Sequence, residues 1–100
     1  MDASGISDIT LFLDAAIGAD DIPMAILGEA KTRILRALAQ RASHGYALAR
    51  ALDMSLSTVY EHLVELELER LVEFEWKGRR KEWKLTKRGR ALVDILQSDR

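Results

Sequence analysis

The chain has 100 residues, of which 48% are hydrophobic and 31% are charged, a composition typical of one folded globular domain. No run of about 18 apolar residues is present, so no membrane-spanning helix and no membrane partner are expected. The absence of cysteine excludes disulfides, thiolate metal ligands and cysteine catalysis, and it fits a reducing, cytoplasmic location. The N-terminal region has Asp2 and Asp8 but no basic residue, so a secretory signal is not expected.

The formal net charge is only −1, but the charges are grouped along the chain. Residues 1–29 contain six acidic residues and no basic one, whereas residues 30–50 contain five basic residues and no acidic one. Residues 51–75 contain seven acidic residues against one basic, and residues 76–90 contain eight basic residues against one acidic. This grouping predicts surfaces of opposite charge, with scattered solvent-exposed charge as the alternative.

The first predicted element is a helix over residues 7–17, for which Ser7 is a suitable N-cap and Gly18 a suitable stop. The Asp-Ile-Pro sequence that follows disfavours a helix immediately before the proline. We therefore expect an apolar and acidic N-terminal segment over residues 1–22, suited to be a dimer arm. A single domain over residues 23–100 is expected to follow it.

Three helices are predicted in the first part of this domain. Apolar residues at helical spacing predict the first over about Gly28–Gln40. The Ser43-His44-Gly45 sequence then interrupts the pattern and opens a second, short helix through Leu52. After a two-residue break, the hydroxyl of Ser55 is expected to cap a third helix that runs to about Arg70.

The apolar period then changes from about 3.6 to about 2 residues, which indicates a β-hairpin with one apolar face. Two registers compete. A two-residue turn would place Glu75 opposite Glu82, whereas a four-residue turn over residues 78–81 would pair Glu75 with Lys84. Because like charges in opposite positions are unfavourable, we expect the four-residue turn.

After the hairpin, Thr86 is predicted to cap a last helix that returns apolar residues to the core. These residues are Leu92, Ile95 and Leu96. Trp76 and Trp83 are expected to pack against the helices rather than form a ligand platform, and Tyr46 is expected to pack beneath the helix-turn-helix. His44 is expected to serve the start of the second helix.

Helix, short helix, turn, helix, basic hairpin and helix is the order of a winged helix-turn-helix, a mainly α fold with a small β-hairpin wing (α+β). The segment ALARALDMSLSTVYEHL at residues 47–63 resembles, without a gap, the helix-turn-helix of the PadR, ArsR and MarR families of transcriptional regulators. His44-Gly45-Tyr46 is similar to PadR proteins in particular, and Leu85-Thr86 with the following Lys-Arg-Gly-Arg is similar to the strand-to-helix junction of all three families. The resemblance covers about residues 27–97. It implies a regulator that binds double-stranded DNA sequence-specifically, as a homodimer.

Two features of the helix-turn-helix depart from the pattern that the resemblance implies. The turn residue that is usually glycine is Asp53 here, and aspartate tolerates the left-handed backbone conformation. These families usually carry basic residues near Glu61, Val64 and Glu65, whereas the third helix here has an acidic stripe, Glu61-Glu65-Glu69. At 100° per residue, the inward side of this helix is expected to consist of Val59, Leu63, Leu66 and Arg70. The outward side is expected to consist of Ser57, Glu61, Val64, Glu65 and Leu68.

Two interpretations of the third helix are therefore open. In the first, only its N-terminal turn enters the major groove, where side chains contact phosphates or base edges. The predicted contacts are Ser55, Ser57, Thr58, Tyr60 and Glu61. In the second, the helix contacts another protein.

The predicted wing is the stronger indication of DNA binding, because a basic β-tip can follow the phosphate backbone or insert arginine into a narrow minor groove. The predicted contacts are Lys77, Arg79, Arg80, Lys81 and Lys84. The alternative is a hairpin kept soluble by its charge. Lys31, Arg33 and Arg36 on the first helix are further candidates for phosphate contacts, or else ordinary solvated surface.

The remaining expectations concern partners. Homodimer contacts are expected from two apolar sets, which are Ile9, Phe12 and Leu13, and Leu92, Ile95 and Leu96. The alternative for the first set is that it folds back on its own domain. No metal, cofactor or enzyme activity is expected, because two histidines without cysteine do not suggest a metal site and no nucleophile–base set is present. No small-molecule effector is indicated. Two rival functions are a protein-interaction module, which would dock through Val64, Leu68 and the acidic stripe, and a sequence-neutral, chromatin-type DNA-binding protein.

Overall fold

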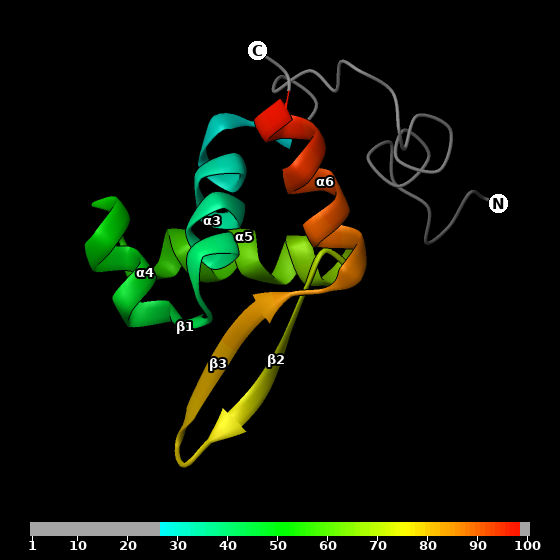
Figure 1. Ribbon diagram of the computed structural model, residues 1–100. Helices are drawn as coiled ribbons and strands as arrows, with labels where there is room; N and C mark the ends of the chain where they lie inside the picture. The colour runs from blue at the N-terminus through cyan, green and yellow to red at the C-terminus, as the bar shows by residue number, and fades with distance from the viewer. Residues whose placement is uncertain (1–26, 99–100) are drawn as a thin grey trace, which may run out of the picture.

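The computed structural model describes residues 27–98, and these form four helices and one three-stranded antiparallel sheet (Figure 1). The helices are α3 (Glu29–Gln40), α4 (Gly45–Leu52), α5 (Leu56–Leu68) and α6 (Lys87–Ser98). The strands are β1 (Ser43–His44), β2 (Val72–Lys77) and β3 (Arg80–Leu85), in the spatial order β1-β3-β2. The predicted winged helix-turn-helix is confirmed. The helix predicted over residues 7–17, with Ile9, Phe12 and Leu13, lies outside the described residues.

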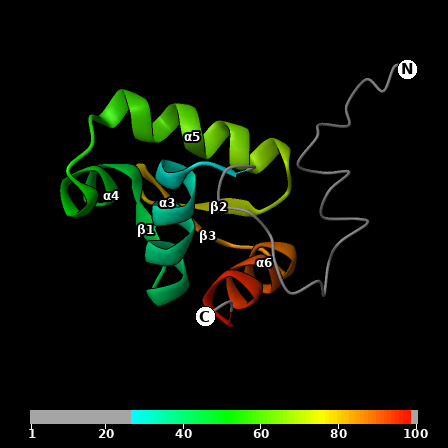
Figure 2. The same cartoon turned by 90° about the horizontal axis from the view of Figure 1, so that it is seen from above.

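Helix α3 is the centre of the helical part, because it contacts α4, α5 and α6. Viewed from above, α3 lies between α5 and α6 (Figure 2). Its buried face consists of Ile34, Leu35 and Leu38, at the spacing that the sequence predicted. The rest of the core consists of Leu27 ahead of α3, Leu48 and Ala49 of α4, Val59, Leu63 and Leu66 of α5, Leu71 after it, Val72 and Trp83 of the sheet, and Leu92, Val93 and Leu96 of α6.

The turn between α4 and α5 is built as the sequence predicted. Asp53 has the left-handed conformation, with φ 56° and ψ 49°. The following amide of Met54 donates to the carbonyl of Ala49 at 2.9 Å, which closes the end of α4. Ser55 caps α5, because its Oγ accepts from the amide of Thr58 at 3.1 Å. His44 caps α4 through its Nδ1, which accepts from the amide of Ala47 at 3.3 Å.

Helix α5 ends at Leu68, slightly earlier than predicted, because Arg70 has φ 63° and turns the chain into β2. Arg70 is therefore exposed, and its predicted inward position is wrong. This turn is held from the start of α6, where the hydroxyl of Thr86 donates to the carbonyl of Arg70 at 2.6 Å. The same hydroxyl accepts from the amide of Gly89 at 3.0 Å, so the predicted cap of α6 is confirmed.

The register predicted for the hairpin is wrong. Lys77 pairs with Arg80, so β2 and β3 are joined by the two-residue turn Gly78-Arg79, and Glu75 lies opposite Glu82. Gly78 has φ 64° and Arg79 has no positive φ, which is the pattern of a type II′ hairpin turn. Two contacts offset the repulsion that favoured the longer turn: Glu75 bonds diagonally to Lys84, and Phe74 packs on Trp83 opposite it, with ring centroids 5.0 Å apart.

This register separates the two tryptophans. Trp83 is 1% exposed and belongs to the core, as predicted, whereas Trp76 lies opposite Lys81 near the tip and is 62% exposed. The prediction that Trp76 packs in the core is wrong because the hairpin extends beyond the helices (Figure 1). Tyr46 is 55% exposed on α4, so its predicted place beneath the helix-turn-helix is also wrong.

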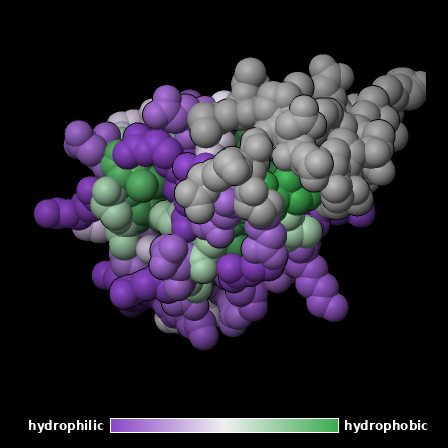
Figure 3. Space-filling model, turned by 45° about the horizontal axis from the view of Figure 1, so that its top comes forward, coloured by the Kyte–Doolittle hydropathy of each residue, from purple (hydrophilic) through white to green (hydrophobic). Residues whose placement is uncertain are grey.

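The surface seen in Figure 3 is mainly hydrophilic, and apolar side chains appear on it only in small areas. Within residues 27–98, no helix is long and apolar enough to cross a membrane. The large apolar side chains that are exposed are Leu56, Val64 and Leu68 on α5, Tyr46 on α4 and Trp76 on β2.

Candidate nucleic-acid interface

The N-terminal turn of α5 presents short polar side chains to solvent. Ser55 and Ser57 are exposed, and Thr58 is half-buried. Ser55 is engaged within the turn, because it accepts from the amide of Thr58 and donates to its Oγ1 at 2.8 Å. Of these hydroxyl groups, that of Ser57 is the least committed, because its contact with Ser55 Oγ is long, at 3.4 Å.

One turn further along α5, Tyr60 and Glu61 have different surroundings. Glu61 is exposed, as predicted. The ring of Tyr60 lies across Gly45, so that a Cβ at Gly45 would be only 2.7 Å from Tyr60 Cζ. Gly45 in the His-Gly-Tyr sequence therefore lets the first turn of α4 approach α5 closely and seats the tyrosine ring between them.

The acidic stripe of α5 is partly neutralised from inside the domain. The Nζ of Lys31 lies 2.7 Å from Oε1 of Glu65, and the hydrogen bond and charge of Lys31 lower the pKa of that carboxyl. Lys31, a predicted candidate for a phosphate contact, is thus paired with α5. Arg33, a second candidate, donates to the carbonyl of Leu52 at 2.9 Å, and Arg36 is exposed.

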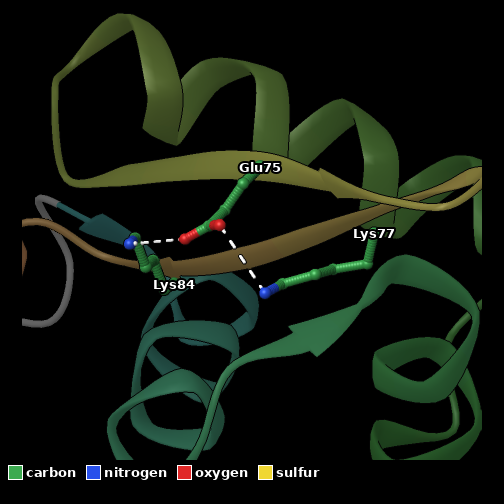
Figure 4. Close-up of polar contacts among 3 residues, drawn as sticks. All are labelled: Glu75, Lys77 and Lys84. Atoms are coloured by element: carbon green, nitrogen blue, oxygen red, sulfur yellow. Dashed lines mark hydrogen bonds and ion pairs between the residues drawn. The ribbon is translucent and has the colours of Figure 1, made fainter.

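Two of the five basic wing residues share one carboxylate (Figure 4). Lys84 lies 2.8 Å from Glu75, and Lys77 lies 3.6 Å from it. Lys84 is the main cause that lowers the pKa of Glu75, with Lys77 contributing, and Glu75 in turn raises the pKa of Lys84. The charge of these lysines is therefore partly compensated before any ligand binds.

Lys81 lies over the aromatic side chains of the hairpin. Its Nζ is 4.3 Å from the ring centroid of Phe74, 5.6 Å from that of Trp76 and 5.7 Å from that of Trp83. These distances are in the range of cation–π interactions. The ammonium group of Lys81 therefore lies over the aromatic rings at the edge of the core rather than at the tip of the wing.

Arg79 and Arg80 are the exposed cations of the wing tip. The Nη1 of Arg80 lies 3.0 Å from Nε2 of His44, which places the wing next to the start of α4. Arg79 makes no hydrogen bond or ion pair with the other residues of the 27–98 range. The tip thus carries the least compensated positive charge of the wing.

A cleft of about 440 Å³ lies between the wing and the starts of α4 and α5. The residues lining it are His44, Tyr46, Leu56, Tyr60, Trp76, Arg79, Arg80 and Lys81. None of these is acidic, so among the described residues this hollow is bordered by cationic, aromatic and hydroxyl groups. The structure therefore brings the predicted Tyr60 together with three of the predicted wing residues.

Sequence reasoning missed His44, Tyr46, Leu56 and Trp76 as residues of the cleft. The His-Gly-Tyr motif was the available signal, but it was assigned only to the cap of α4 and to the core. Arg50 was also missed: its Nη1 donates to the hydroxyl of Tyr46 at 3.1 Å, which orients that exposed ring.

The apolar residues proposed for a dimer on α6 are largely used within the protomer. Leu92 and Leu96 are buried in the core, and Ile95 is partly buried against it. Among the described residues, no group of three or more histidine or acidic side chains is placed to hold a metal ion.

Comparison with known proteins places the chain in a family. The family model described as "Transcriptional regulator PadR-like family" matches residues 34–94. The chain belongs to the PadR-like family of transcriptional regulators. A comparison with curated proteins finds no significant match.

Solved structures similar to this PadR-like chain share its fold. One is the homodimeric winged helix-turn-helix DNA-binding domain Mb0332 from Mycobacterium bovis, a possible ArsR-family transcriptional regulator. It is 28% identical to this chain with a TM-score of 0.67, and the match covers 94% of this chain and 86% of that one. Another is a MepR mutant from S. aureus bound to an oligodeoxyribonucleotide, with 30% identity, a TM-score of 0.60, and coverage of 68% and 51%. ZitR from Lactococcus lactis, at 19% identity and a TM-score of 0.72, covers 91% of this chain and 71% of its own and shows the fold alone.

Proposed function

We propose that this PadR-like regulator binds double-stranded DNA sequence-specifically, with the N-terminal turn of α5 in the major groove and the wing tip on the adjacent backbone. The cleft between them carries the proposal, because its border is cationic and hydroxyl-bearing and lacks an acidic side chain. Base contacts are assigned to Ser57, Thr58 and Glu61, and Tyr60 is assigned to the backbone. Ser55 is assigned to positioning the turn as its cap.

The pairing of Lys31 with Glu65 supports this assignment, because it reduces the negative charge of α5 beyond the turn that would enter the groove. The wing supports the assignment as well, because Arg79 and Arg80 at the tip are exposed, whereas Glu75 compensates Lys77 and Lys84. Phosphate contacts are accordingly assigned first to Arg79 and Arg80, and second to Lys77, Lys81 and Lys84.

We further infer that the regulator acts as a homodimer. One helix-turn-helix covers only a short stretch of duplex, and two copies with recognition helices about 34 Å apart would read a twofold-symmetric site. The similar domain Mb0332 is described as homodimeric, which supports this inference. The proposed dimer contacts are Ile95, which is the least buried of the three apolar residues on α6, and the apolar residues of the 1–22 segment. This segment precedes the 23–100 domain. We place the protein in the cytoplasm and assign it no catalytic role.

Selection from a pool of random duplexes, followed by anisotropy titrations of the selected and of a scrambled duplex at several salt concentrations, tests the function. We expect preference for the selected sequence and an affinity that falls steeply with salt, with a slope of about −0.9 per neutralised phosphate. Equal affinity for all duplexes would favour sequence-neutral coating. Failure to bind any duplex at low salt would contradict DNA binding.

Replacing both Arg79 and Arg80 with alanine tests the wing. We expect a salt slope about 2 units less steep and a similar loss for selected and scrambled duplexes, since phosphate contacts are sequence-independent. The matched control replaces Arg41 and Lys87, which are exposed and lie outside the cleft, and removes the same charge. If both double variants bind equally well, the wing does not contact DNA.

Contact with a protein is the second candidate role of α5, and two exposed apolar side chains favour it. Val64 is 50% exposed and Leu68 is 76% exposed. Replacing both with glutamine is expected to leave duplex affinity unchanged. A loss of the dimer in sedimentation analysis of this variant would assign the surface of Val64 and Leu68 to self-association. If sedimentation and duplex affinity are both unchanged, this surface takes part neither in self-association nor in DNA binding.

A further inference from the structure

His44 joins the helix-turn-helix to the wing through both of its ring nitrogens. Its Nδ1 accepts a hydrogen bond from the amide of Ala47 at 3.3 Å and so caps α4. Its Nε2 lies 3.0 Å from Nη1 of Arg80. The imidazole is half-buried and lines the cleft, together with Arg79, Arg80 and Lys81.

These two contacts cannot both be hydrogen bonds to a neutral imidazole. A neutral ring has one N–H and one lone pair, whereas a backbone amide and a guanidinium group only donate. The amide hydrogen of Ala47 is fixed in place by the first turn of α4, and without His44 this helix terminus would lose its side-chain cap. Arg80 is exposed, and its guanidinium group is free to turn. The lone pair therefore lies on Nδ1, and Nε2 carries the hydrogen.

This tautomer leaves two donors converging on the same space. The nitrogen atoms Nε2 of His44 and Nη1 of Arg80 lie 3.0 Å apart, and the N–H group of each needs an acceptor. The acid nearest in register is Glu82, opposite His44 in the sheet, and within residues 27–98 no ion pair joins it to either residue. Tyr46 and Tyr60 border the same cleft with hydroxyl groups, and Arg79 and Lys81 add positive charge. An anionic oxygen would satisfy both donors.

We propose that His44 and Arg80 together form a two-donor site for one phosphate group of the DNA backbone, with the cap of α4 fixing the imidazole tautomer that donates. The proposal rests on the proposed function, in that the phosphate is taken from the duplex. It explains why the His-Gly-Tyr motif lies at the edge of the cleft. His44 then links the position of the wing to that of α4 through one shared ligand.

The tautomer is tested without any DNA. Long-range ¹H–¹⁵N correlation spectra of the full chain at about pH 8, where free imidazole is neutral, report which ring nitrogen carries the hydrogen. We expect the Nε2–H form for His44. The Nδ1–H form would overturn the proposal, because Nε2 would then accept from Arg80 and no donor pair would remain.

The phosphate contact is tested with His44→Asn, Arg80→Ala and the double variant on the selected duplex. Asparagine is a good N-cap, so H44N keeps the cap of α4 and loses the Nε2 donor, and its melting temperature is expected to equal that of the wild type. Each single variant is expected to bind roughly tenfold more weakly, the effect of losing a hydrogen bond to a charged group. If one phosphate is shared, the double variant loses far less than the hundredfold expected for independent contacts. Unchanged affinity in H44N, or additive losses, would overturn the proposal.

A titration with inorganic phosphate separates this site from the function itself. Phosphate is expected to shift the ring resonances of His44 in the wild type, and to shift the same His44 resonances less in the Arg80→Ala variant. If no duplex binds but phosphate shifts these resonances, the anion site stands and the proposed function fails. If phosphate shifts them while H44N binds the duplex normally, the site takes free phosphate and the assignment to DNA is overturned.

Discussion

The ammonium group of Lys31 on α3 lies 2.7 Å from the carboxylate of Glu65 on α5. The sequence places these residues far apart and suggests that each acts on its own, one as a phosphate contact and one as part of an acidic stripe. Their pairing crosses the interface between two helices that also pack through buried apolar residues. The pairing therefore links the net charge of α5 to the stability of the domain.

This ion pair is expected to make stability depend on pH in the acid range. Lys31 lowers the pKa of Glu65 in the folded protein below its ordinary value of 4.5, so the unfolded chain binds the proton more readily. The stabilisation is present above the unfolded pKa and is lost as the pH falls through the folded pKa. Urea unfolding should therefore show that the difference between wild type and Glu65→Gln shrinks from neutral pH to about pH 3.

Glu61→Gln is the control for this experiment, because Glu61 lies on the same helix, is exposed, and makes no ion pair within residues 27–98. Its effect on the free energy of unfolding is expected to be small at every pH. If E65Q and E61Q behave alike across the pH series, the Lys31–Glu65 pair does not stabilise the fold in solution.

Glu75 is predicted to weaken DNA binding by the wing. Because it pairs with Lys77 and Lys84, Glu75→Gln frees two positive charges on the hairpin. We expect several-fold tighter binding at low salt and a salt slope steeper by up to about 1 unit. Glu29→Gln removes an equal charge at the start of α3, at the end of the helical part away from the wing tip (Figure 1), and should change neither quantity. An E75Q protein with unchanged affinity would show that the hairpin lysines stay away from the duplex.

Two serines at the start of α5 are expected to separate stability from binding. Ser55→Ala removes the oxygen that accepts from the amide of Thr58 and should cost about 1 kcal/mol in the free energy of unfolding. Ser57→Ala removes an exposed hydroxyl and should leave stability unchanged while lowering affinity for the selected duplex. Chemical unfolding and anisotropy of both variants measure the two effects. A stability loss in S57A, or none in S55A, would reverse these roles.

Gly89 is expected to tolerate no side chain. A Cβ at this position would overlap the carbonyl oxygen of Leu71, which is backbone and cannot rotate away. We expect Gly89→Ala to lower the free energy of unfolding by about 2 kcal/mol or more, even though alanine is the better helix former. Gly78→Ala is the comparison: nothing lies near its Cβ, and its positive φ should cost only about 1 kcal/mol. Equal losses in the two variants would mean that α6 shifts to make room.

Most local features of this domain were predictable from the sequence. The caps at Ser55 and Thr86 and the left-handed Asp53 were predicted, because each depends on residues within one helical turn. The hairpin register was predicted wrongly on the charges of directly opposed residues. In the structure, Glu75 forms an ion pair with its diagonal neighbour Lys84. The register is therefore set by the Phe74–Trp83 contact and by the turn at Gly78.

By itself, the sequence determined the order of the helices and the hairpin, the buried apolar residues of α3 and α5, and the presence of a basic wing, since apolar periodicity and capping act over a few neighbouring residues. The short strand β1, which pairs with β3, was not predicted. Only the tertiary structure decided which charges remain available. Lys31 and Lys84 are paired, Arg79 has no ion pair with another residue of the described part of the chain, and Arg80 contacts His44. The reason is that long charged side chains form ion pairs with the groups nearest to them in space, and these distances follow from the packing of elements that are remote along the chain.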